Sequence, residues 1–129
     1  MKEGSVYPPP RWVHDSGVRY GLGSDAMMVN VFNPMQTIYW AVTGRSIDGS
    51  RVTQQRLSRI EALRAHTINN AWLLREENEI GSIESAKRAD FVVLDKDYLR
   101  VAEEELAKLR ALEVYVEGTL VHSHAGTAN

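Results

Sequence analysis

Cysteine is absent from the sequence, and its absence removes several kinds of chemistry at once. Without thiols the chain has no disulfide bonds, no cysteine-bound zinc and no thiol nucleophile. Long apolar runs are also missing, since none approaches the roughly 20 residues of a membrane-spanning helix. Residues 1–12 lack the apolar centre of a signal peptide. These absences favour a cytoplasmic protein with no membrane partner.

An excess of charge of either sign is lacking as well. The chain has 15 basic and 17 acidic side chains, a formal net charge of −2 and a sequence pI near 6.1. Because the basic residues are dispersed, no nucleic-acid partner is expected. Hydrophobic residues make up 43% of the chain and charged residues 25%, which is typical of a globular protein and argues against disorder. The length of 129 residues suits one domain.

Three consecutive prolines, residues 8–10, interrupt the N-terminal region. Proline has no amide hydrogen and its ring clashes with the preceding turn of a helix, so it is excluded from helix interiors and central strands. We therefore expect residues 1–16 to form an extended lead-in, with residues 1–10 outside any helix.

Residues 17–25 carry the first clear pattern. The apolar side chains of Val18, Tyr20 and Leu22 alternate with polar or small residues, and this period of two predicts a strand over residues 18–23. Two glycines inside the run indicate a close approach by another part of the chain, or a bend. The run ends in a polar pair whose second residue is Asp25.

A helix is expected over residues 35–42. Asn33 suits the N-cap, and the proline that follows it suits the first helical position. Gly44 is a typical stop signal. Residues 45–55, rich in small and polar side chains, are expected to form a surface loop.

The clearest helix signal begins at Ser58, because Glu61 follows it at the spacing of a capping box. This helix is expected to continue to Arg75. Five residues recur at spacings of three and four and are expected to face a core: Ile60, Leu63, Thr67, Ala71 and Leu74.

The last third of the chain is rich in strand formers. Four consecutive apolar residues, 91–94, predict a strand buried on both faces. Residues 101–109 predict a short acidic helix. Two β-rich runs within residues 113–122 flank Gly118 and predict a hairpin with a tight turn at that glycine. Residues 123–129 form a polar tail.

Four stretches in this order resemble the C-terminal part of a metal-dependent hydrolase of the amidohydrolase superfamily, most closely its amidohydrolase-3 branch. They are residues 17–25, residues 57–71, residues 80–84 followed by 87–95, and residues 116–121, so the resemblance spans roughly residues 17–122. The family usually has a glycine just before the lysine of its Lys-x-Ala-Asp signature. Here Ala86 precedes Lys87, so the turn either avoids a positive φ or tolerates strain.

The resemblance implies an α/β fold, namely the C-terminal fragment of a (β/α)8 (TIM) barrel hydrolase plus the last strands of its accessory β-sandwich domain. Residues 17–78 would hold the last barrel strand and the following helices, residues 79–122 the accessory β-domain portion, and residues 123–129 the tail. A complete barrel needs about 250 residues. We therefore expect the fragment to self-associate or to pair with the missing barrel portion.

The chemistry that the resemblance implies is hydrolysis of carbon–nitrogen bonds in small-molecule amides or cyclic amides by metal-activated water. One or two divalent metals, with zinc as the first expectation, lower the pKa of the bound water. Asp25 matches the aspartate at the end of the eighth barrel strand, which is both metal ligand and general base. The family's His-x-His pair has no counterpart before Asp25. The fragment alone is therefore expected to bind no metal and to lack activity.

Other interpretations remain open at this stage. Asp25 alternatively caps a loop or helix, and His14 and His66 are expected to be packing or surface residues. His122 and His124 have the His-x-His spacing but are expected to be solvated, because they lie in the terminal hairpin and tail. A non-enzymatic binding or assembly module derived from the same fold is the alternative function. A helical regulatory module unrelated to the barrel would have no strand over residues 18–23.

Overall fold

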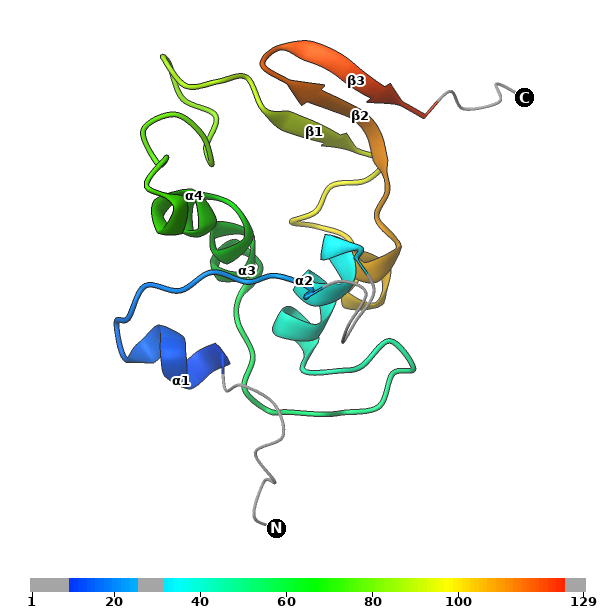
Figure 1. The fold of residues 1–129 in the computed structure, drawn as a ribbon. Helices are drawn as coiled ribbons and strands as arrows, with labels where there is room; N and C mark the ends of the chain where they lie inside the picture. The colour runs from blue at the N-terminus through cyan, green and yellow to red at the C-terminus, as the bar shows by residue number, and fades with distance from the viewer. Residues whose placement is uncertain (1–9, 26–31, 125–129) are drawn as a thin grey trace, which may run out of the picture.

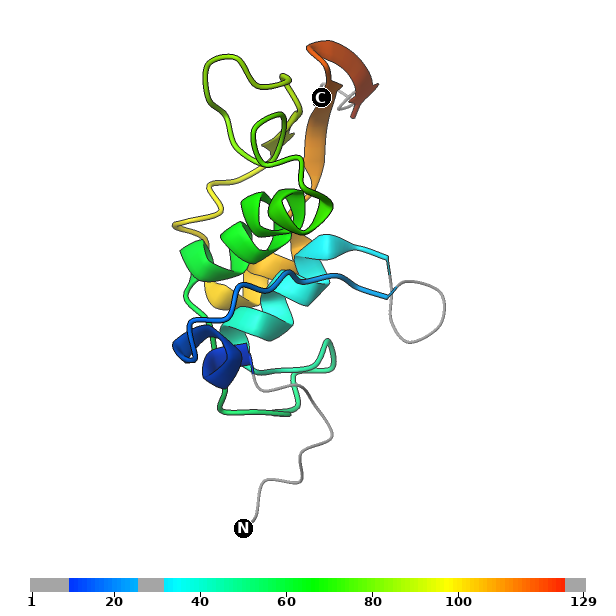
Figure 2. The same cartoon turned by 60° about the vertical axis from the view of Figure 1, so that its left-hand side comes forward.

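The computed structural model describes residues 10–25 and 32–124, which form a group of helices with a small sheet at one end (Figures 1 and 2). The elements, in chain order, are α1 (Pro10–Asp15), α2 (Pro34–Thr43), α3 (Arg59–His66), α4 (Ile68–Leu74), β1 (Phe91–Leu94), the 3₁₀ helix η1 (Glu103–Lys108), β2 (Ala111–Val116) and β3 (Thr119–Ser123). Within these ranges no helix is long and apolar enough to cross a membrane.

Helix α1 corrects the expectation of an extended segment over residues 10–16. It begins at Pro10, where proline occupies the first helical position and removes no helical hydrogen bond. Residues 1–9 of the expected lead-in lie outside the described residues, as does most of the tail, residues 125–129.

The prediction of a strand over residues 18–23 is wrong, and these residues are coil. A strand needs a neighbouring strand for its ladder of hydrogen bonds. Among the described residues, the main-chain groups of Tyr20 and Leu22 bond instead to α3 and α4, as described below.

Helix α2 confirms the signals at both of its ends. The Asn33 side chain accepts a hydrogen bond from the Met35 amide, and Gly44 adopts the left-handed conformation, φ 67°, at the C-cap. A Cβ atom at Gly44 would lie 2.2 Å from the Thr53 carbonyl oxygen, so the loop after α2 folds back closely against this glycine.

The helix expected from Ser58 to Arg75 is in fact two helices. The capping box of Ser58 and Glu61 is present, but Thr67 has φ −121° and ψ −96° and separates α3 from α4. The amide of Thr67 donates to the carbonyl of Arg64, and its hydroxyl donates to the carbonyl of Leu63. These local bonds, made by a β-branched residue, compete with continuation of the α-helical pattern.

The apolar stripe expected to face the core is wrong for most of its members. Ala71 is buried, whereas Ile60 is 50% and Leu74 66% exposed. Helix α3 packs through its small residues Ala62 and Ala65 instead, both of which are fully buried.

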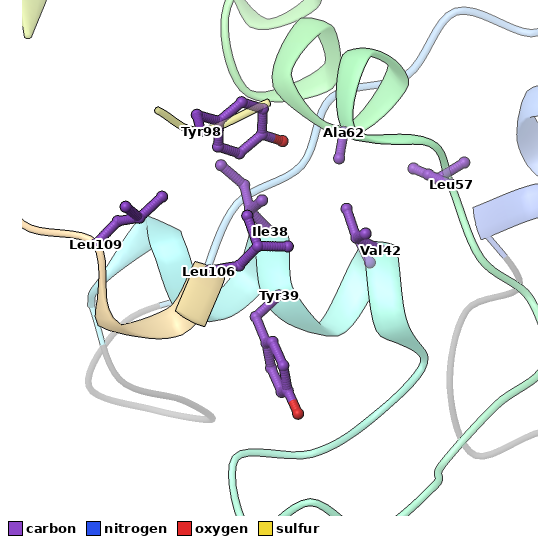
Figure 3. Close-up of a cluster of buried hydrophobic side chains, with 9 residues drawn as sticks. Ile38, Tyr39, Val42, Leu57, Ala62, Tyr98, Leu106 and Leu109 are labelled. Carbon is purple, nitrogen blue, oxygen red and sulfur yellow. The ribbon is translucent and has the colours of Figure 1, made fainter. Parts of the chain in front are cut away.

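The core is centred on α2, which lies between α3 and η1 (Figure 3). Its buried side chains Ile38 and Val42 meet Ala62 from α3 and Leu106 from η1. The same cluster also contains Tyr39, Ala41, Leu57, Tyr98 and Leu109. The core therefore joins helices from the first half of the chain to the segment between β1 and β2.

Arg59 strengthens this connection between the two halves of the chain. Its guanidinium donates to the carbonyl oxygens of Tyr98 at 2.6 Å and Val101 at 2.5 Å. The Tyr98 hydroxyl in turn donates to the carbonyl of Arg59 at 2.8 Å. Burial of Tyr98 raises the pKa of its hydroxyl to about 12, so the hydroxyl stays protonated as a donor at neutral pH.

The sheet is antiparallel, with strand order β1-β2-β3, with Phe91 opposite Tyr115 and with Tyr115 opposite Leu120. The expected hairpin is confirmed, since Glu117 and Gly118 both have positive φ, as tight hairpin turns require. Burial of β1 on both faces is wrong, because Val92 is 45% and Val93 39% exposed. The expected acidic helix is the 3₁₀ helix η1.

Ala86 adopts φ 70°, so the turn at the family's glycine position keeps the left-handed backbone despite the change of residue. The left-handed conformation costs an L-residue about 1–2 kcal/mol, and the greater freedom of glycine in the unfolded chain offsets part of that difference. We expect Ala86→Gly to raise the free energy of unfolding by about 0.5–1 kcal/mol, measured by urea denaturation. Ala102→Gly, at φ −57°, is the matched control and should lower it. A loss of stability in both variants would contradict this explanation.

Candidate catalytic carboxylate and the segment that carries it

Residues 18–25 run along α3 and α4 and end at Asp25 (Figures 1 and 2). The Leu22 amide donates to the carbonyl of Ala65 at 3.0 Å. The side-chain amides of Asn69 and Asn70 donate to the carbonyls of Tyr20 and Leu22 at 2.8 and 3.0 Å. The segment is thus fixed to the helices by three hydrogen bonds.

Gly21 permits this close approach, as its position in the sequence pattern indicates. A Cβ atom there would lie 1.8 Å from Oδ1 of Asn70 and 2.9 Å from Cδ1 of Leu73. Real Cβ contacts essentially never fall below 3.0 Å, so a larger residue at this position requires the Asn70 carboxamide and the end of the Leu73 side chain to move.

The start of the segment is held by a cluster of polar side chains around Glu61. Arg11 donates through its two terminal nitrogens to the two carboxylate oxygens of Glu61, at 3.2 and 2.5 Å. Nε2 of His14 lies 3.0 Å from Glu61, and its Nδ1 lies 3.3 Å from the Tyr20 hydroxyl. This cluster connects α1, α3 and the segment, so we assign His14 a packing role.

The cluster changes the acid–base properties of its members. The Arg11 guanidinium holds the pKa of Glu61 down at about 2, with a further contribution from the Ser58 amide, while partial burial acts in the opposite direction. Burial raises the pKa of Tyr20. At neutral pH Glu61 is therefore a carboxylate and Tyr20 a neutral phenol.

Asp25 is exposed at the end of the segment and has φ 51°. The residues that the structure describes contain no group of three or more His, Cys, Asp or Glu side chains that could hold a metal ion. One carboxylate does not make a metal site, so these residues alone do not fit the divalent metal that the family resemblance implies.

The other histidines of the described residues do not gather with Asp25 or with one another into a group that could hold a metal ion. His66 is partly buried at the end of α3, and burial lowers its pKa. Its Nε2 has no hydrogen-bond partner among the described residues. His122 in β3 and His124 just after it are exposed, and both views place that strand on the sheet, apart from residues 18–25 (Figures 1 and 2).

A cavity of about 450 Å³ opens elsewhere, beside Arg11, Arg56 and Arg59. Each of these arginines already has partners: Arg11 pairs with Glu61, Arg56 lies 3.9 Å from Glu103, and Arg59 binds two carbonyl oxygens. Asp25 does not line this cavity. The cavity therefore adds nothing to the chemistry of Asp25.

Asn69 and Asn70 hold the segment that ends at Asp25, and the sequence patterns described above do not identify them. Two adjacent carboxamides in a predicted helix are a usable signal, because asparagine is a weak helix former whose side chain often bonds backbone groups. Nothing in their spacing indicates which backbone groups they bind, since those carbonyls lie 48 and 49 residues away in sequence.

Comparison with known proteins assigns the chain to a family. An amidohydrolase family model, that of the amidohydrolase-3 branch, matches residues 2–122. An N-substituted formamide deformylase from Arthrobacter pascens is 36% identical over 120 residues, which are 92% of this chain and 22% of that protein. An imidazolonepropionase from Micrococcus luteus is 37% identical over 87 residues, 67% of this chain and 20% of that protein. The chain belongs to the amidohydrolase family.

Solved structures show the corresponding fold. Escherichia coli guanine deaminase superposes with a TM-score of 0.66 at 23% identity, over 88% of this chain and 29% of that one. An amidohydrolase from Thermotoga maritima gives 0.60 at 23% identity, over 87% and 25%. The chain thus spans about a fifth of its curated relatives and about a quarter of these barrel proteins. The missing strand over residues 18–23 therefore does not indicate an unrelated helical module.

The Glu61 cluster gives a pH dependence of stability. The folded-state pKa of Glu61, about 2, lies below its ordinary value of 4.5, so its stabilisation is present above that value and is lost as the pH falls toward 2. We expect Glu61→Gln to cost about 1–2 kcal/mol at pH 7, after allowance for solvent screening, and to flatten the decline in stability between pH 5 and 2. Urea denaturation across this pH range measures both effects. The exposed Glu104→Gln is the control, and an equally steep decline in Glu61→Gln would contradict the assignment.

Proposed function

We propose that this chain contributes the catalytic aspartate to a metal-dependent amidohydrolase that acts on carbon–nitrogen, non-peptide bonds of small molecules. The main support is the position of Asp25, at the end of a segment that three hydrogen bonds fix to α3 and α4, within residues matched by the family model. The names of the relatives agree, since deformylases, imidazolonepropionases and deaminases act on carbon–nitrogen bonds.

In this proposal Asp25 is a metal ligand and the general base. An ionised carboxylate only accepts hydrogen bonds, so it can orient an attacking water and receive its proton. Its exposure leaves the side chain accessible to groups from elsewhere in the enzyme. Amide or cyclic amide substrates, zinc as the metal and a cytoplasmic location remain parts of the proposal.

The proposal also holds that this chain is inactive by itself. Its described residues contain no group of three or more His, Cys, Asp or Glu side chains that could hold a metal ion, and Asp25 is the single carboxylate that the family resemblance assigns to the metal. The chain spans about a fifth of its relatives. The remaining ligands would come from the barrel portion that the relatives possess in addition.

A chimera tests this function. Residues 2–122, the range matched by the family model, replace the corresponding segment of the Arthrobacter pascens deformylase, which is 36% identical to this chain over 120 residues. We expect the purified 129-residue chain to show no turnover of N-substituted formamides. The zinc-loaded chimera should turn them over, and Asp25→Asn should lower its kcat by about 10²–10⁴-fold, as for loss of a general base.

Asp15→Asn serves as the control, because Asp15 is an exposed carboxylate on α1 that pairs with Arg11. Metal-stimulated turnover by the isolated chain that Asp25→Asn abolishes would contradict the proposed inactivity. Full activity of the Asp25→Asn chimera would contradict the role of Asp25.

The exposed sheet supports a related proposal, self-association of the chain or pairing with a complementary barrel portion. All five residues of the edge strand β3 are exposed, among them Leu120 at 48% and Val121 at 57%. Unpaired edges with apolar side chains readily add a strand from another chain. This observation also favours the alternative function, a non-enzymatic assembly module of the same fold.

Sedimentation measures this association. Over about 10–300 μM we expect the isolated chain to form dimers or larger species, and Val121→Lys to weaken association by about tenfold or more, because a charge on an edge strand opposes pairing. Ile47→Lys is the matched control, since Ile47 is 64% exposed in the loop after α2. A compact monomer throughout this range would contradict the proposal.

A further inference from the structure

The peptide groups at Leu22 are held on two sides, and this double contact carries an inference that rests on the proposed function. The amide of Leu22 donates to Ala65, and its carbonyl accepts from Asn70. We propose that Asn70 is a positioning residue, which sets the location of Asp25 by fixing Leu22 against the end of α3 and the first turn of α4.

The break between α3 and α4 makes this contact possible. In an unbroken α-helix the carbonyl of Ala65 would accept from the amide four residues later, that of Asn69. Helix α3 instead ends at His66, and the amide of Thr67 bonds back to Arg64. The carbonyl of Ala65 lies in this last turn, where helix carbonyls lack helical partners, and it accepts from Leu22 instead.

The side chain of Asn70 is oriented by contacts on both sides. Its amide nitrogen lies 3.0 Å from the Leu22 carbonyl and 3.4 Å from that of His66. Its oxygen lies 1.8 Å from the position that a Cβ atom of residue 21 would take, so the carboxamide occupies space that the absence of a side chain at Gly21 leaves open. The carboxamide is therefore packed directly against the segment.

Asp25 depends on this anchor because Leu22 is the last residue of the segment with a main-chain bond to the described residues. Gly23 and Ser24 separate the two, a distance of at most about 10 Å along an extended chain. A Cβ atom added at Gly23 would meet nothing within 4 Å among the described residues, so no close packing restrains this glycine. A displacement of Leu22 is therefore passed on to the carboxylate.

Asn69 provides a matched comparison. It lies on the same helix and makes the same kind of bond, 2.8 Å to the Tyr20 carbonyl. Its contact is two residues farther from Asp25, and Leu22 has its own anchors between the two. Loss of the Asn69 bond should therefore affect stability with little effect on Asp25.

The test uses the zinc-loaded chimera with Asn70→Leu and Asn69→Leu, since leucine is close to asparagine in shape but donates no hydrogen bond. We expect a similar decrease in melting temperature in both variants. Asn70→Leu should lower kcat by about 10–100-fold with KM changed less than about threefold, and should weaken zinc retention against a chelator by about 10–100-fold, as for other residues that orient a ligand. Asn69→Leu should change each quantity less than about threefold. Equal effects of the two variants on kcat and zinc retention would overturn the inference.

Two further measurements keep the outcomes separate. If Asn70→Leu does not fold, Asn70→Ser, which keeps a shorter donor, takes its place. Its kcat and zinc retention should lie between those of the wild type and those expected for Asn70→Leu, and wild-type values of both would overturn the inference.

If the wild-type chimera is inactive, the proposed function fails. Hydrogen exchange in the 129-residue chain then tests the anchor. The Leu22 amide should exchange at least tenfold faster in Asn70→Leu than in Asn69→Leu, and equal rates would overturn it.

Discussion

The burial of α2 is the constraint on which the rest of the structure depends. Six of its ten residues are buried, on more than one side of the helix. Ala41 on α2 and Ala62 on α3 are both fully buried, and such small side chains let two helices approach closely. Leu106 of η1 covers another side, so that α3 and η1 are placed relative to each other through α2 (Figure 3).

Local signals in the sequence predicted the ends of elements well. The caps at Asn33, Gly44 and Ser58 and the turn at Gly118 are all present, because each depends on residues within a few positions. Burial was predicted poorly. The apolar run of β1 and most of the apolar stripe on α3 and α4 are exposed in this structure. An apolar pattern in the sequence shows that a surface is apolar, but it does not show whether another part of the same chain covers that surface.

For the candidate site too, the local features could be predicted from the sequence and the long-range contacts could not. The family resemblance pointed to Asp25, and the alternation with glycines pointed to a segment in close contact with another element. The contacts themselves could not be predicted, because the carboxamides of Asn69 and Asn70 bind carbonyls almost 50 positions away. The helix break at Thr67 was not predicted either, since the expected periodicity continues through it, and the interruption shows in the backbone angles and hydrogen bonds of Thr67.

The pairing of Arg59 with Tyr98 and Val101 has a consequence for how the chain unfolds. The expected boundary at residue 79 marks a change from helices to strands, but the core continues across it through Tyr98, Leu106 and Leu109. Removing the later segment would uncover α2 and leave the Arg59 guanidinium without its two carbonyl partners. The helices and the segment leading into the sheet therefore lose their structure together, and heat or denaturant acts on them as one cooperative unit.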